Sequence, residues 1–187
     1  MDQVTRDMLL AQDGDDAAFA RLVATTEPDV RRFCTWFTRP VHDIDDLVQE
    51  TFLRAFRGLN SFSGRSTATA WLLTIARRVC LDLAERRRRD ESITTELSSL
   101  TGISSSVGYV GDLGADVVGA LLLEELPEPF REAFVLVRIL GFGYDEVAEI
   151  LACPRGTVQS RVARARVMLA QLFRSSESQH GVSSLSS

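Results

Sequence analysis

The feature that most constrains this chain is a polar segment that separates two stretches of helical periodicity. The segment, SITTELSSLTGISSSVGYVGDLGADVV at residues 92–118, is rich in serine, glycine and threonine and contains few large apolar side chains. Such a composition is typical of a flexible linker. We therefore predict a first domain at residues 1–91, a linker at 92–118 and a second domain at 119–174. The polar run at 175–187 predicts a disordered tail.

Both flanking stretches place apolar residues at the three- and four-residue spacing of amphipathic helices. In the first domain one series runs from Ile44 to Leu59 and another from Trp71 to Leu83, with the polar loop NSFSGRST between them. Upstream, residues 16–37 supply one or two further helices, with Pro28 in a first turn. Because no strand pattern or repeat occurs, we predict an all-α fold of two small helical domains joined by a flexible linker.

The second domain contains the pattern of a helix-turn-helix. Its periodicity predicts helices at about 128–140, 144–151 and 155–172. Gly141 and Gly143 permit a sharp turn after the first, and Pro154 fits the start of the third. Only three residues connect the second helix to the third, as in the motif whose second helix can enter the major groove of DNA.

The third helix carries a surface suited to nucleic acid. Residues 153–174 include arginines and no carboxylate, although the net charge of the chain is -5. Val158 and Val162 fall on the side that faces the preceding helix. On another side lie Gln159, which can contact an adenine, and Arg164, which can grip a guanine. Ser160 and Ala163 share that side, and Arg155, Thr157, Arg161 and Arg166 are placed for phosphates. A merely solvated basic helix is the alternative, but the short preceding helix and tight turn favour nucleic-acid binding.

Composition argues against other classes of function. The two histidines, His42 and His180, form no set of nucleophile, base and orienting group, so we expect no enzyme and no cofactor. The three cysteines lie far apart in sequence and predict neither a metal site nor a disulfide framework, only small buried side chains. We see no signal peptide and no apolar run long enough to insert in a membrane, and so we expect a cytoplasmic protein. Lysine is absent, which fits a GC-rich coding bias as well as a binding role.

Three blocks of this sequence resemble the extracytoplasmic-function (ECF) sigma factors of bacterial RNA polymerase, in the sigma-70 superfamily. DIDDLVQETFLRAFRGLNSF and AWLLTIARRVCLDLAERRRR are similar to the second domain of that family, and LPEPFREAFVLVRILGFGYDEVAEILACPRGTVQSRVARAR is similar to its fourth. The blocks follow the order of the family, with its linker between the domains. The resemblance implies an initiation factor that binds polymerase core, recognises the -35 and -10 promoter elements and melts DNA without covalent chemistry.

The resemblance also implies partners and site residues. The partners are promoter DNA and the polymerase core, through the clamp of the beta-prime subunit and the beta flap, and an anti-sigma factor is a candidate third partner. The positions that match the clamp-binding surface are Asp46, Gln49 and Glu50. Without the resemblance, these residues also fit an acidic solvated helix face. The -10 surface matches Asn60, Phe62, Trp71, Arg77 and Arg78, although Phe62 and Trp71 fit a core role individually. The -35 contacts match Gln159, Ser160, Ala163 and Arg164, with Arg161 on the backbone.

A free-standing transcriptional regulator is the competing hypothesis. It would combine a helical sensor domain with the helix-turn-helix. It predicts a ligand pocket or a dimerisation helix in residues 1–91, together with a symmetric DNA site. A single major-groove helix makes few contacts, so such a monomer would bind duplex DNA weakly without help, which polymerase core would provide.

Overall fold

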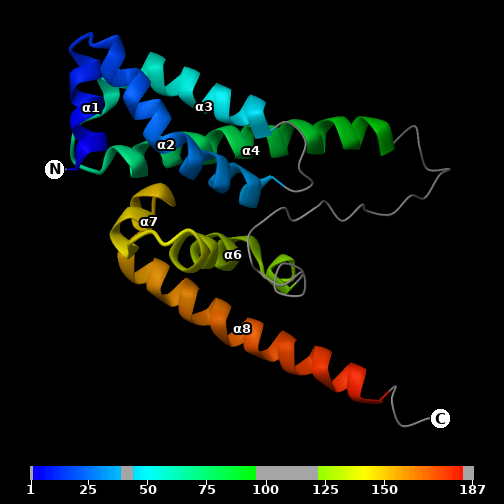
Figure 1. Cartoon of the computed structure of the whole chain (residues 1–187). Helices are drawn as coiled ribbons and strands as arrows, with labels where there is room; N and C mark the ends of the chain where they lie inside the picture. The colour runs from blue at the N-terminus through cyan, green and yellow to red at the C-terminus, as the bar shows by residue number, and fades with distance from the viewer. Residues whose placement is uncertain (1, 39–43, 96–121, 183–187) are drawn as a thin grey trace. The chain divides into compact units, whose positions relative to one another are not determined.

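The structure is a computed structural model that describes residues 2–38, 44–95 and 122–182. Every regular element among these residues is helical, which confirms the predicted all-α fold (Figure 1). The chain divides into two compact units, Met1–Tyr109 and Val110–Ser187. Each unit has its own buried apolar side chains, and each is described separately below.

The described residues of the first unit form four α-helices and a short connecting turn. In chain order these are α1 (Gln3–Gln12), α2 (Asp16–Phe37), α3 (Ile44–Gly58), the 3-10 turn η1 (Leu59–Ser61) and α4 (Ala68–Thr95). Aspartates begin the first two helices, because Asp2 accepts a hydrogen bond from the Thr5 amide and Asp15 accepts one from the Ala18 amide. Helix α2 packs on α1, α3 and α4, and fully buried side chains such as Phe33 and Leu72 lie in the core.

Helix α2 runs without a break through Pro28, which lies in its interior. The prediction that Pro28 occupies a first turn is therefore wrong. Proline removes one backbone hydrogen bond and costs about 3 kcal/mol in an isolated helix. Thr26, Val30 and Phe33 on either side are almost fully buried, and their burial offsets that cost.

Two of the cysteines lie together in the core of the first unit. The thiol of Cys80 on α4 donates to Cys34 Sγ on α2 at 3.9 Å, and both residues are buried. They are free thiols that fill space between the helices, as small apolar residues would. Cys153 is half-buried in the second unit.

The second unit packs two short helical segments against one long helix. Helix α6 (Glu128–Phe134) continues into a π-helical turn, η2 (Val135–Ile139), and is followed by α7 (Tyr144–Ile150) and α8 (Arg155–Val182). Gly141 has φ +81° and forms the turn between η2 and α7, which explains the glycine at that position. Helices α6 and α7 both pack on α8.

Two helices extend further than the sequence analysis predicts. Helix α4 continues to Thr95, beyond the predicted end of the first domain at residue 91, and linker positions 96–118 lie outside the described residues. Helix α8 continues to Val182 and so includes positions 175–182 of the predicted tail, whereas 183–187 are not described. Serine and glutamine cost a helix only a few tenths of a kcal/mol each, so a polar composition does not distinguish a helix end from a tail.

Candidate functional site

Helices α7 and α8 form a helix-turn-helix with a tightly bonded turn. The Leu151 amide donates to the Val147 carbonyl at 2.9 Å, and the Cys153 amide donates to the Ala148 carbonyl at 3.0 Å. At the start of α7 the Gly143 amide donates to Glu146 Oε2 at 2.9 Å. These bonds satisfy backbone groups at both ends of α7, so a helix of two turns holds a fixed position before α8.

Ala152, in the turn, has φ +50°, a conformation in which an L side chain is strained. We predict that Ala152→Gly raises the stability of the second unit by about 0.5–1 kcal/mol, because glycine adopts this conformation without strain. The measurement is thermal unfolding of the full chain. Ala148→Gly, inside α7, is the matched control and should instead destabilise by about 1 kcal/mol. Equal losses from both variants would contradict the strain.

The start of α8 separates a buried face from an exposed one. Val158, Val162 and Ala165 are at most 2% exposed, and Val147 and Ile150 of α7 are buried as well, as the spacing predicts. The exposed face carries the residues predicted to contact bases, Gln159, Ser160, Ala163 and Arg164. Helix α8 therefore presents the amide of Gln159 and the guanidinium of Arg164, with small residues between them. This surface can approach base edges closely.

Three residues predicted to lie on phosphate already have partners within the chain. Arg155 Nη1 contacts the carboxylate of Asp145 on α7 at 2.8 and 3.1 Å. We expect Thr157 to offer a phosphate either its backbone N–H or its hydroxyl, and here the amide donates to the Pro154 carbonyl at 2.8 Å, which leaves the hydroxyl for that contact. Arg161 is half-buried and its Nη1 lies 3.9 Å from Cys153 Sγ. No local sequence pattern indicates the role of Asp145, whose charge lies beside the start of α8.

The residues predicted for the -10 element divide into exposed and buried groups. Asn60 and Arg78 are exposed, and Arg77 is half-buried. Phe62 is only 4% exposed and packs edge-on against half-buried Trp71, with ring centroids 5.7 Å apart. Phe62 therefore belongs to the core in this structure, the role that it fits individually, and its contact with a -10 base stays a prediction. Its ring instead supports the loop that leads from η1 to α4.

A glutamine that the sequence analysis overlooked fixes the same loop. Gln12 Nε2, at the end of α1, donates to the carbonyls of Leu59 at 2.6 Å and Phe62 at 2.8 Å. The partners are 47 and 50 residues away in sequence, so no local pattern indicates the contact. Gln12 thus holds the backbone beside exposed Asn60 in place.

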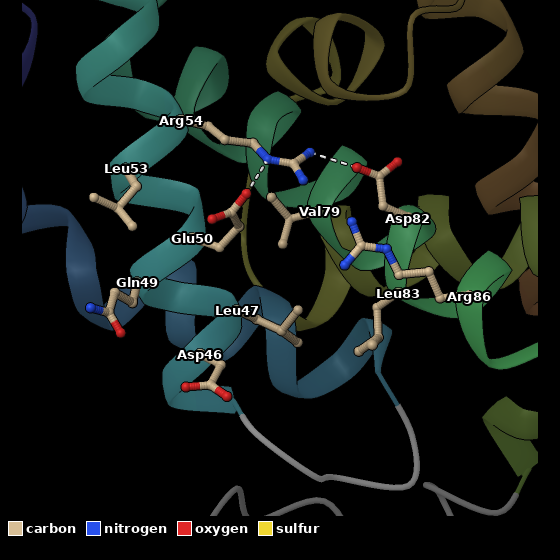
Figure 2. A pocket seen from close by; sticks show the side chains of 10 residues that line it. All are labelled: Asp46, Leu47, Gln49, Glu50, Leu53, Arg54, Val79, Asp82, Leu83 and Arg86. Atoms are coloured by element: carbon tan, nitrogen blue, oxygen red, sulfur yellow. Dashed lines mark hydrogen bonds and ion pairs between the residues drawn. The ribbon is translucent and has the colours of Figure 1, made fainter. Parts of the chain in front are cut away.

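Between α3 and α4 lies a groove of about 480 Å³ that includes all three predicted polymerase-facing residues. Asp46 and Gln49 are exposed, whereas Glu50 is half-buried. Figure 2 shows Gln49 pointing away from α4 and Glu50 pointing along the groove towards Arg54. Arg31 on α2 also pairs with Asp45, with Nη1 2.7 Å from Oδ1, which ties the start of α3 to the rest of the unit.

The fold and these surfaces define the structural class of the protein. It is all-helical and has two units, of which the second contains a helix-turn-helix. In the described residues there is no group of three or more histidine, cysteine, aspartate or glutamate side chains arranged to hold a metal ion. None of the helices described is both long enough and apolar enough to cross a membrane.

Comparison with known proteins identifies the family. Residues 22–90 match the family model for sigma-70 region 2, and residues 120–169 match that for sigma-70 region 4. The probable RNA polymerase sigma-C factor of Mycobacterium bovis is 37% identical over 163 residues, which cover 87% of each chain. The ECF RNA polymerase sigma factor EcfG of Rhodopseudomonas palustris is 37% identical over 146 residues, or 78% of this chain and 80% of its own. The chain belongs to the ECF sigma factors of the sigma-70 family.

Solved structures support the same assignment. CnrH, in complex with the cytosolic domain of CnrY, matches with a TM-score of 0.70 and 28% identity over 93% of this chain and 99% of its own. The sigma factor RpoE of Bartonella quintana, in complex with the anti-sigma factor NepR, matches with a TM-score of 0.65 and 29% identity over 83% and 96%. This chain is an alternative sigma factor that directs transcription initiation, and its partners are RNA polymerase and promoter DNA. Its family consists of non-catalytic DNA-binding regulators.

Proposed function

We propose that this protein joins RNA polymerase core in the cytoplasm, reads a -35 and a -10 element through separate units and melts the start region without cofactor or covalent chemistry. The observation that carries the proposal is the exposed face of α8, where Gln159 and Arg164 stand over a buried row of valines within the region 4 match. That face has the side chains and the rigid backing that base reading requires.

The second unit would bind the -35 element through α8. Gln159, Ser160, Ala163 and Arg164 would face base edges, while Arg161 and exposed Arg155 would contact the backbone. Arg155 must exchange its partner Asp145 for a phosphate when it does so. Both side chains of this pair are more than half exposed, so the exchange has a low cost.

The first unit would read and open the -10 element beside η1 and the start of α4. Exposed Asn60 is placed to hydrogen-bond an extruded base, and Arg78 and Arg77 are placed along the strand backbone. Half-buried Trp71 would offer part of its ring for stacking. Phe62 would act indirectly, by holding Trp71 from below.

Two surfaces would bind the polymerase core. We assign Asp46, Gln49 and Glu50 to the clamp of the beta-prime subunit, since they line the groove between α3 and α4. The beta flap is assigned to an apolar groove of about 570 Å³ in the second unit, between the residues before α6 and the middle of α8. Phe173 in that groove is 49% exposed, and such an exposed apolar patch is typical of a protein-binding surface.

An anti-sigma factor is the third partner that we propose. RpoE of Bartonella quintana, whose fold this chain shares, was solved in complex with the anti-sigma factor NepR. An inhibitor that covered the α3–α4 groove or the apolar groove of the second unit would compete directly with polymerase. Competition binding with polymerase core distinguishes these two surfaces.

The proposed function is tested by multi-round transcription on genomic DNA fragments with sigma-free core polymerase. We expect specific transcripts only when both the protein and the core are present, and loss of those transcripts when either promoter element is scrambled. Tight binding of the protein alone to duplex DNA, without core-dependent initiation, would instead favour a free-standing regulator.

A further inference from the structure

Arg54 connects the two helices that line the groove of the first unit. Its Nε donates to Glu50 Oε1 at 2.7 Å, one turn earlier on α3, and its Nη1 donates to Asp82 Oδ2 on α4 at 2.6 Å (Figure 2). The hydrogen bonds to Asp82 and then to Glu50 raise the pKa of Arg54 above its ordinary value. A single guanidinium thus holds carboxylates from two helices.

The pair with Asp82 lies half-exposed at the edge of a partly apolar groove. The side chains of Arg54 and Asp82 are 32% and 47% exposed, and Leu47, Val79 and Leu83 line the groove beside them. An arginine that bonds through two different nitrogens fixes the direction of both partners, which a single point charge cannot do. The contact therefore restrains where the Glu50 carboxylate points and links α3 to α4 at the edge of the groove.

Glu50 lies nearer to α4 than Gln49 does. Positions 49 and 53 are one turn apart on the side away from α4, whereas 50 and 54 are one turn apart on the side that faces it, and 46 lies one turn before both 49 and 50. Figure 2 shows Gln49 and Leu53 on the side away from α4, and Glu50 and Arg54 towards it. Without a partner, the Glu50 side chain would be free to choose among several rotamers at the edge of the groove.

We propose that Arg54, anchored on Asp82 of α4, is a positioning residue for polymerase binding, which holds Glu50 in the geometry that the polymerase contact requires. The inference rests on the proposed function, because it takes Glu50 as part of that contact. Arg54 itself acts through Glu50. Ordering a long side chain before association removes part of the entropy cost of binding, so the fixed rotamer tightens the complex.

The test is the affinity of the full-length protein for sigma-free core polymerase, measured by fluorescence anisotropy. Arg54→Met removes both hydrogen bonds but keeps an apolar stem of similar length, and Arg57→Met, at an exposed position on the same helix, is the matched control. We expect Arg54→Met to weaken core binding about fivefold, within the range of coupling in a shared ion-pair network, and Arg57→Met to leave it near the wild-type value. Arg54→Lys, which retains the charge but not the two-nitrogen geometry, should fall between them.

A double-mutant cycle separates positioning from general stability. If Arg54 acts through Glu50, Arg54→Met adds little further loss in a Glu50→Ala background, even where thermal unfolding shows the same destabilisation in both backgrounds. An equal loss in both backgrounds would overturn the inference, and so would tighter binding by Arg54→Met, which would mean that Arg54 competes with polymerase for Glu50.

Single variants distinguish failure of this inference from failure of the proposed function. If Gln49→Ala and Glu50→Ala both bind core as tightly as the wild type, the polymerase surface is wrongly placed and the inference fails with it. If they bind weakly while Arg54→Met binds normally, the surface stands and only the role of Arg54 is overturned. Circular dichroism of each variant establishes that it is folded.

Discussion

Replacing Gln49 and Glu50 together with alanine is expected to reduce core-dependent transcription about 30-fold or more. Loss of one residue that dominates an interface typically costs about 2 kcal/mol, or about 30-fold, so the expected effect requires only one of the two residues to dominate binding. Gln49 is exposed on α3, and Glu50 lies in the groove beside it. Neither side chain belongs to the buried core, so the fold should persist.

The measurement is multi-round transcription at a core concentration below saturation, where a loss of affinity appears directly as loss of transcript. Asp13→Ala combined with Asp16→Ala is the control, because it removes two exposed carboxylates from the same unit that do not line the groove. The control should retain wild-type activity although it changes the net charge more. Equal losses in both double variants would show that overall charge, and not the α3 surface, controls activity.

Local sequence patterns predict which side of a helix faces the core. Spacing places Leu47 and Phe52 on the inner side of α3, and both are buried. On α8 the same argument separates Val158 and Val162 from Gln159 and Arg164, because a helix with one buried face repeats every three to four residues. Periodicity thus predicts which side chains are available to a partner.

Contacts between distant parts of the chain could not be predicted in this way. Arg54 is four residues from Glu50, a helical spacing that indicates a pair, but 28 residues separate it from Asp82. Likewise, the bonds of Gln12 to the carbonyls of Leu59 and Phe62 depend on how α1 packs against η1. Such contacts follow from tertiary packing, which a single sequence does not specify residue by residue.

Phe62 illustrates the same limit within the proposed -10 surface. An aromatic residue in a loop, next to polar residues, can either stack on a base or pack in the core. The sequence alone does not decide between these two roles. In the structure its ring is buried against Trp71, so burial decides for the core. The end of α8 is a second example, since a run of polar residues fits a helix and a disordered tail equally well.

Arg164→Ala is expected to weaken initiation about tenfold or more at promoters whose -35 element offers a guanine to this side chain. A bidentate contact between arginine and guanine contributes about 1–3 kcal/mol of discrimination against the wrong base. Arg164 is exposed, and neighbouring Ala163 leaves room for a close approach. The loss should be confined to one base position, where the variant accepts all four bases more evenly.

The measurement is transcription from a library of promoters that differ at each -35 position, with the -10 element held constant. Arg166→Ala, an exposed arginine two residues further along α8, is the control for charge alone. If Arg166 contacts only phosphate, its loss weakens all promoters equally and lowers the salt dependence by about one unit of slope. Should Arg164→Ala also weaken every promoter equally, Arg164 would be a backbone contact, and base reading on α8 would then rest on Gln159 and its neighbours.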